Sequence, residues 1–402
     1  MMIRKTIILV SALLFSGIIS GQTSFESILK AKSLLMAGEP AKSVEELSSA
    51  ITRKKDGRLY IARAEAFMHE GNHEMALNDY TVANSLISHS GDYGLARIYA
   101  LKGDAKTSLC YLEMNFLSSF RKSEKEVMLD AAFSRIEKSP EWRQFWRRDW
   151  YSVLETGVSE IEYYLSTGRT RSAVEKLSEL EGSYKGNEEL QYAGALVNLS
   201  TGKPAEAVKI LAGMSALQSG NEKYLRLLAK AQTEANNPSG ASITYSRLLD
   251  IEVPDASLLL LRAGCYRKTD ENARAMSDIE RYISLYPRDK SALSLAGKIR
   301  SAQGDNLKAL DYFSENLKYH PGDASCFVDR ANTYFLLKSW ESAINDYGMS
   351  LDLDPSNPEA WLNKGIARLN SGKTSDACHD FRYALKLGNK KAADYISRHC
   401  IK

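Results

Sequence analysis

The sequence predicts an all-α fold, a solenoid of about ten helix-turn-helix repeats in two arrays, and three regular spacings carry this prediction. Alanine recurs every 34 residues at Ala173, Ala207, Ala241, Ala275, Ala309, Ala343 and Ala377. A large apolar residue follows each of these alanines by four positions, and a mostly small residue precedes each by twelve. Proline repeats at the same interval at Pro287, Pro321 and Pro355. Self-similarity at such a period indicates stacked hairpins.

Each repeat is predicted to contain two antiparallel helices. If the recurring alanine is numbered position 20, small residues at positions 8 and 20 let the two helices approach closely. The large residue at position 24, for example Phe313 or Tyr347, fills the gap against the neighbouring repeat. Proline ends the second helix because its ring clashes with the preceding turn and it has no N–H to donate. Each hairpin therefore buries its apolar face only against its neighbours.

These residues resemble the tetratricopeptide repeat (TPR) family. The last two complete repeats show the resemblance best, at Phe327, Ala331, Tyr334, Ala343, Tyr347 and Pro355, then at Trp361, Gly365, Ala377 and Phe381. The resemblance implies a curved solenoid with a concave face lined by the first helix of each repeat. In this family that face commonly receives a peptide or a partner helix.

The spacing divides the chain into five segments. We expect a signal peptide at 1–21, an N-terminal array at 22–120, an aromatic-rich helical joint at 121–153, a C-terminal array of seven repeats at 154–391 and the end of a capping helix at 392–402. In the joint, Trp142, Phe145 and Trp146 fall on one helical stripe, which predicts burial. A ligand-binding or membrane-binding helix is the alternative.

The N-terminus predicts export. Arg4 and Lys5 precede an apolar stretch of 13 residues, which is too short to span a bilayer comfortably, and Ser20 or Gly21 offers a cleavage point. We expect a periplasmic or envelope-associated protein whose mature chain has no membrane span and whose cysteines can pair. With 53 basic and 50 acidic residues, the chain has no charge excess of the kind that nucleic-acid binders use.

One string imitates a metal site. His69, Glu70 and His73 form an H-E-x-x-H match, which in zinc peptidases places two histidines on one helix face. Here Gly71 and Asn72 favour a turn, and no third protein ligand can be named. A zinc peptidase is therefore the alternative to a non-catalytic protein, and we predict no enzyme, no metal and no cofactor.

Cys378 and Cys400 are the candidate disulfide. A turn at Gly388-Asn389 places one cysteine 11 residues before Asn389 and the other 11 residues after it, so a hairpin brings them level. This closing unit also resembles that of secreted Bacteroidetes TPR proteins, which is the only basis for a taxon. Two unpaired thiols, or metal binding with His379 or His399, remain the alternatives.

Partner binding is predicted at positions 2, 5, 6, 9 and 12 of the first helices. The candidate residues are Arg226, Lys230, Lys298, Asn332, Phe335, Asn363 and Ile366. A basic stretch thus gives way to an amide-flanked apolar stretch, but Val328 replaces the lysine of the family's carboxylate clamp.

From these positions we expect a protein-interaction scaffold that binds a protein or peptide. Self-association through residues 22–51 is a further expectation, because terminal repeats expose an interface unless they are capped. A third reading is a solute-binding module, which needs a closed pocket; the surroundings of Trp142 are the candidate place.

Overall fold

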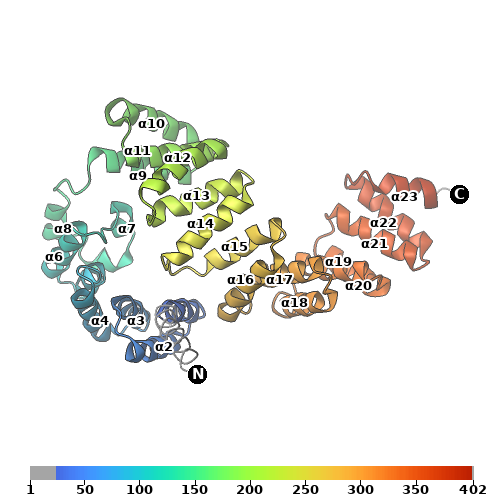
Figure 1. Ribbon diagram of the computed structural model, residues 1–402, viewed down its shortest axis with the longest axis horizontal. Coiled ribbons are helices and arrows are strands. Elements are labelled where there is room, and N and C mark those ends of the chain that lie inside the picture. Colours follow the sequence, from blue (N-terminus) through green and yellow to red (C-terminus); the bar gives the residue numbers. More distant parts are fainter. Residues whose placement is uncertain (1–23, 401–402) are drawn as a thin grey trace, which may run out of the picture. The chain divides into compact units, whose positions relative to one another are not determined.

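The computed structural model describes residues 24–400, and in that range it contains helices and no strand (Figure 1). The all-α repeat fold predicted from the 34-residue spacing is therefore confirmed. The predicted signal peptide lies outside the described residues.

The helices alternate as first and second members of hairpins. Residues 24–36 are helical. They are followed by α2 (Pro40–Arg53), α3 (Gly57–His69), α4 (His73–Leu86), α5 (Asp92–Leu101), α6 (Ala105–Phe116), α7 (Glu124–Met128), η1 (Ala131–Arg135) and α8 (Pro140–Phe145). Next come α9 (Val153–Ser166), α10 (Thr170–Tyr184), α11 (Glu188–Ser200), α12 (Pro204–Leu217), α13 (Glu222–Glu234), α14 (Pro238–Asp250), α15 (Ser257–Lys268) and α16 (Asn272–Leu285). The last are α17 (Lys290–Ala302), α18 (Asn306–Tyr319), α19 (Ala324–Leu336), α20 (Trp340–Leu353), α21 (Pro358–Asn370), α22 (Thr374–Lys386) and α23 (Ala392–His399).

The chain divides into two compact units. Unit 1 comprises Met1–Asn237 and Ser246–Asp255, and unit 2 comprises Pro238–Tyr245 and Ala256–Lys402. The sequence suggested a division at the aromatic-rich joint, whereas this joint lies inside unit 1 and the division runs through α14. An unbroken spacing of alanines thus does not reveal where packing between repeats weakens.

A left-handed residue ends the first helix of each hairpin. Gly71, Gly202 and Gly372 have φ of 74°, 72° and 81° at the same repeat position. Lys338 adopts φ of 55° at this position as well. Glycine suits a helix end of this kind because it has no Cβ to clash, and the chain then reverses into the second helix.

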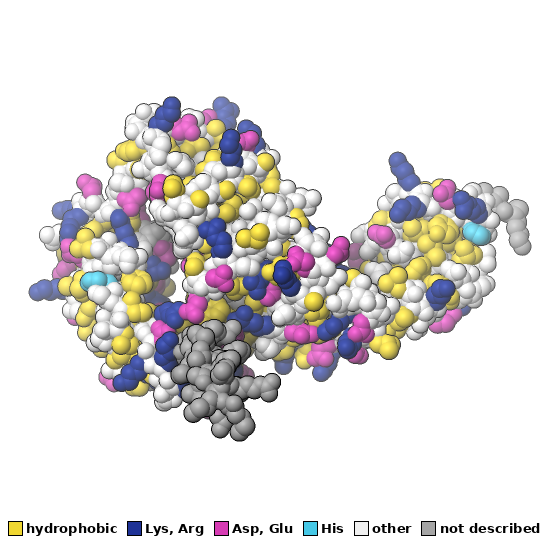
Figure 2. All heavy atoms as spheres, in the orientation of Figure 1, with side chains coloured by type: hydrophobic (Ala, Val, Ile, Leu, Met, Phe, Trp, Pro, Cys, Tyr) yellow, Lys and Arg dark blue, Asp and Glu magenta, His cyan; other side chains and the backbone are white. Residues whose placement is uncertain are grey.

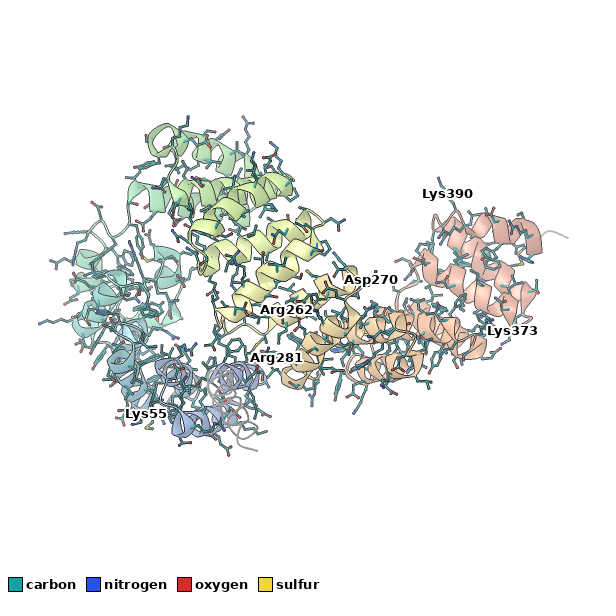
Figure 3. The ribbon with its side chains drawn as sticks, viewed as in Figure 1. Lys55, Arg262, Asp270, Arg281, Lys373 and Lys390 are labelled. Atoms are coloured by element: carbon teal, nitrogen blue, oxygen red, sulfur yellow. A yellow bond between two sulfur atoms is a disulfide. The ribbon has the colours of Figure 1, made fainter. Side chains whose placement is uncertain are left out.

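Buried arginine–aspartate pairs lock the two helices of several hairpins together. Each arginine donates twice, at 2.7–2.9 Å, to an aspartate 16 residues later: Arg63 to Asp79, Arg262 to Asp278 and Arg330 to Asp346. Figure 3 labels Arg262, on α15. The bidentate geometry fixes the helix pair at a site where an unpaired carboxylate would be costly.

The joint packs onto α5 and α6 through aromatic rings. Trp142 and Phe145 are each 7% exposed, in a cluster with Phe116, Phe133 and Ile136. The rings of Phe116 and Phe145 are 5.8 Å apart. The predicted buried stripe is therefore confirmed, and the joint extends the core of the N-terminal repeats.

Candidate functional site: the first-helix face of the repeats

The basic stretch predicted on α13 lies beside acids of the same chain. Arg226 pairs with Glu222 and with Asp255, both at 2.8 Å. Lys230 is 65% exposed, and its ammonium lies 3.9 Å from Glu234. Much of the positive charge expected on this helix is therefore offset within unit 1. Asp255 comes immediately before the next repeat, so its approach to α13 depends on how neighbouring repeats stack.

Lys298 of α17 also has an acidic partner. Its ammonium lies 3.0 Å from Asp329 of α19, and the hydroxyl of Ser294 donates to the same carboxylate. Asp329 occupies position 6 of its repeat, which is one of the positions expected to face a partner. We had not selected it, although the same spacing marks it.

The two predicted asparagines lie on either side of one tyrosine hydroxyl. Tyr347, at position 24 on α20, is fully buried except for its approach to this face, and it donates to Oδ1 of Asn332 at 2.6 Å. Burial raises the pKa of Tyr347, while a hydrogen bond from Asn363 acts in the opposite direction. Because the Asn332 oxygen is engaged, its amide N–H groups remain to donate to a ligand.

Apolar side chains lie next to these amides in unit 2. Phe335 is half-buried, with its ring 5.3 Å from that of Trp340. Ile366 is also half-buried and packs against the cluster that contains Phe381 and the α23 residue Ile396. The first-helix face of unit 2 therefore joins hydrogen-bond donors to partly covered apolar surface.

The corresponding tyrosine of unit 1 belongs to an ionic network. Tyr80 on α4 donates to Glu65, and Arg97 pairs with Glu65 at 3.1 Å and with Asp130 at 3.0 Å. Tyr93 also donates to Asp130 at 2.9 Å. Burial acts to lower the pKa of Arg97, but the two carboxylates outweigh it and the pKa is raised.

A cavity of about 330 Å³ opens on the first-helix face of the first two repeats. Its walls come from residues 24–36 and α3, and from Glu252 and Pro254 in the same unit. Lining residues Arg58, Ile61 and Glu65 occupy positions 2, 5 and 9 of their repeat. The positions used to select groove residues farther along the chain would have found them, but we had not applied these positions before Tyr192.

Two other hollows lie among the second helices. One of about 650 Å³ is lined by α10, α11 and α12, including Gly182 and Gly194. Another of about 430 Å³ is lined by Tyr312 and Asp311 of α18 together with Pro287. The surroundings of Trp142 are tightly packed instead, so the place considered for a solute pocket is wrong.

The H-E-x-x-H string spans two helices. His69 is the last residue of α3, Gly71 has φ of 74°, and His73 begins α4. The two histidines therefore do not share the continuous helix face that the zinc motif requires. Within the part of the chain that the structure describes, no group of three His, Cys, Asp or Glu is arranged to hold a metal.

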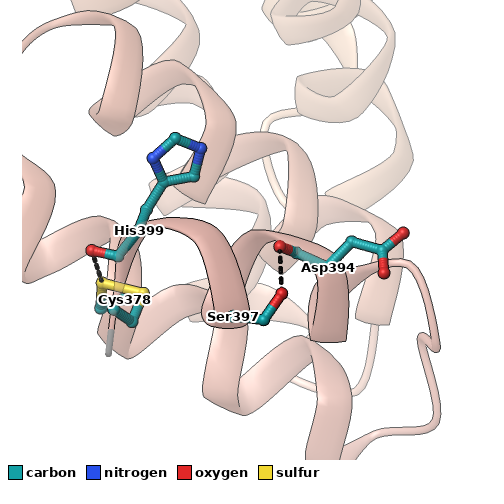
Figure 4. The surroundings of a disulfide bond; sticks show 5 residues. Cys378, Asp394, Ser397 and His399 are labelled. Carbon is teal, nitrogen blue, oxygen red and sulfur yellow. Dashed lines mark hydrogen bonds between the residues drawn. A yellow bond between two sulfur atoms is a disulfide. The ribbon is translucent and has the colours of Figure 1, made fainter. Parts of the chain in front are cut away.

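Cys378 and Cys400 are joined in the structure. Their Sγ atoms are 2.01 Å apart, and their Cα atoms are 5.6 Å apart. Figure 4 shows Cys378 beside the end of α23, with its sulfur 3.7 Å from the carbonyl oxygen of His399. This last approach is a contact, since a disulfide sulfur carries no proton to donate. The bond ties α23 to α22.

The surface carries charges of both signs. Figure 2 shows basic and acidic side chains interspersed on the visible face, without a broad field of either. None of the helices within residues 24–400 has the length and apolar character needed to cross a membrane.

Residues 331–372 match the model of the TPR repeat. This supports, for that segment, the resemblance predicted from the sequence. The matched segment holds Asn332, Phe335, Asn363 and Ile366.

Curated relatives match over a short stretch. DnaJ homolog subfamily C member 7 of Mus musculus is 35% identical over 72 residues, which are 18% of this chain and 15% of that protein. The Protein SGT1 homolog of Oryza sativa subsp. japonica is 32% identical over 73 residues, 18% of this chain and 20% of that protein. The match thus spans at most a fifth of the length of these relatives. A solved tetratricopeptide repeat protein from Parabacteroides merdae is 20% identical, covering 60% of this chain and 96% of that one with a TM-score of 0.48.

Proposed function

We propose that this protein is a non-catalytic interaction scaffold of the bacterial cell envelope, and that the first-helix face of unit 2 binds an extended segment of a partner protein. The single observation that carries the proposal is the arrangement around Tyr347. Its hydroxyl engages the oxygen of Asn332, which leaves amide donors at the surface beside half-buried Phe335. Donors in a row suit backbone carbonyl groups, and the ring suits an apolar side chain.

The amide and apolar residues are expected to contribute more to binding than the basic ones. Arg226 and Lys298 already pair with Asp255 and Asp329, so a partner would have to compete for them. Arg226→Glu would also place two negative charges against each other inside unit 1, so a loss of binding in that variant would be ambiguous. Lys230, which is more exposed, is the cleaner position to test for a basic contribution.

The envelope location is proposed on the N-terminal sequence, with its charged start, apolar stretch of 13 residues and small residues at the end. Cell fractionation tests it directly: the chain should lie in the periplasmic or membrane-associated fraction, shortened by about 20 residues if the predicted cleavage occurs. A full-length cytoplasmic chain would contradict this part of the proposal.

Site-specific photo-cross-linking tests the binding face. A photoreactive residue at Asn363 should trap a partner in living cells, whereas the same residue at Lys318, exposed on the second helix α18, should not. Substituting Asn332 and Phe335 with alanine should abolish the adduct from position 363, while Lys230→Ala should leave it in place. Absence of any adduct from position 363, or equal adducts from both positions, would contradict the proposed face.

A further inference from the structure

The cavity on the first-helix face of unit 1 is assembled from apolar walls and one unusual charge. Ile28, Ala31 and Leu35 come from the helix at residues 24–36, and Ile61 and Ala62 come from α3. These side chains are buried or half-buried, apart from the opening itself. Such a wall favours the apolar part of a ligand, because contact removes both surfaces from water.

Most charged groups in the lining are already paired within the chain. Arg58 pairs with Asp56 at 2.8 Å and also with Glu252. Glu65 pairs with Arg97 at 3.1 Å. These groups close the rim and hold it in place, and they offer little net charge to a ligand.

Lys32 is the exception. Its ammonium donates to the carbonyl oxygen of Pro254 at 2.8 Å, and among residues 24–400 no carboxylate lies within ion-pairing distance of it. Burial lowers the pKa of Lys32, and the more distant Asp255 and Glu222 oppose that effect. Those two acids are themselves bonded to Arg226. A half-buried ammonium without an anionic partner beside an apolar wall is electrostatically incomplete.

The volume limits what can enter. At about 30 Å³ for each water-sized group, 330 Å³ accommodates about eleven non-hydrogen atoms. A helix or a folded domain is too large, whereas a medium-length hydrocarbon chain with one polar head has the right size.

We propose that this cavity binds a small amphipathic monoanion, an apolar chain of roughly ten carbons ending in a carboxylate that pairs with Lys32. The chain lies along Ile28, Leu35 and Ile61, and the carboxylate reaches the ammonium near Pro254. The site is separate from the proposed partner-binding face of unit 2, and it does not depend on that proposal.

Calorimetric titration of the mature chain with sodium decanoate tests the site. Decanoate should bind with one-to-one stoichiometry, and each methylene removed on going towards hexanoate should weaken binding about fourfold. Decanol, which has the same chain and no charge, should bind at least tenfold more weakly. Equal affinity for decanoate and decanol, or no binding of decanoate, would overturn the proposal.

Three variants separate charge from shape. Lys32→Met should weaken decanoate at least tenfold and leave decanol unchanged. Ala62→Leu should fill the cavity and weaken both ligands while retaining Lys32. Lys230→Met is the matched control, because Lys230 occupies position 9 like Lys32 but lies on α13 outside the cavity. It should leave both affinities unchanged.

Thermal unfolding of each variant establishes that it is folded before titration. If Lys32→Met and Lys230→Met weaken decanoate equally, or if folded Ala62→Leu binds it as the unmodified chain does, the cavity is not the site. Cross-linking from position 363 should be unaffected by Lys32→Met, so failure of this inference and failure of the proposed function are distinguishable.

Discussion

Tyr80 in unit 1 and Tyr347 in unit 2 occupy the same repeat position, yet they lie in opposite surroundings. Each hydroxyl donates to the side chain 15 residues before it, which is Glu65 in one case and Asn332 in the other. The next repeat contributes positions 6 and 9. These are Gly94 and Arg97 in unit 1, and Asn363 and Ile366 in unit 2.

The difference shows how one scaffold serves two purposes. In unit 1 the carboxylate of Glu65 and the guanidinium of Arg97 satisfy each other, and Asp130 extends the network into the joint. In unit 2 the amides leave donors at the surface, and Ile366 leaves apolar area. Inner-face residues thus hold repeats together in one region and stay accessible to a partner in the other.

The largest expected effect comes from giving unit 1 the residue of unit 2. Arg97→Ile should lower the free energy of unfolding by about 3 kcal/mol, because Glu65 and Asp130 lose their shared counter-ion. Urea unfolding measures the loss.

Lys298→Ile is its matched control, since Lys298 also occupies position 9 and faces a carboxylate, but it is 49% exposed. Its loss should stay below about 1 kcal/mol. Similar losses in the two variants would mean that the networks of the two units are equivalent, and the comparison would fail.

The disulfide supports the apolar part of the unit 2 face. Ile366 packs against the cluster that includes α23, and Cys400 ties α23 to Cys378 across a sequence separation of 22. Cys400→Ser should cost about 2 to 3 kcal/mol by the loop-closure argument.

Thiol counting in denaturant checks the bond itself. Cys110, Cys265 and Cys326 should react without reduction, and two further cysteines should react after it. Five reactive thiols before reduction would remove the disulfide and with it the support for α23.

Packing beneath Tyr80 offers a smaller test. A Cβ added to Gly94 would collide with the Tyr80 ring, so Gly94→Ala should lower stability by about 1 to 2 kcal/mol despite the better helix propensity of alanine. At Gly264, on the first helix α15, no described atom lies within 4 Å of such a Cβ. Gly264→Ala should therefore raise stability by up to about 1 kcal/mol, and thermal unfolding distinguishes the two signs.

The repeat spacing predicted the helices because it reports a local requirement. A small residue at position 20 and a large one at position 24 are needed wherever two hairpins stack, whatever the neighbours are. The disulfide partners could likewise be placed by counting from the Gly388–Asn389 turn, because a hairpin of known register relates them.

The pairings between repeats could not be predicted in the same way. Whether Asp255 reaches Arg226, or Asp329 reaches Lys298, depends on the small rotation from one repeat to the next, which the spacing does not contain. The division through α14 has the same origin. The cavity was missed for another reason, since Arg58 and Ile61 carry the positional signal but only repeats from Tyr192 onwards were considered.

The smallest expected effect concerns an ion pair between neighbouring repeats of unit 2. The Lys290 ammonium beside Asp323 lowers the pKa of that carboxyl from its ordinary 3.8 to about 2. Since the folded-state pKa lies below the unfolded one, the pair stabilises the fold above pH 3.8, and this contribution is lost as pH falls towards 2. Both groups are partly exposed, so the contribution should stay under about 1 kcal/mol. Unfolding of the unmodified chain and of Lys290→Met, compared between pH 2 and 6, should show a difference that disappears at the acid end. Lys318→Met, at an exposed lysine of the same unit, should show no such window; a similar window in both variants would assign the pH dependence to the overall charge of the chain instead of to this pair.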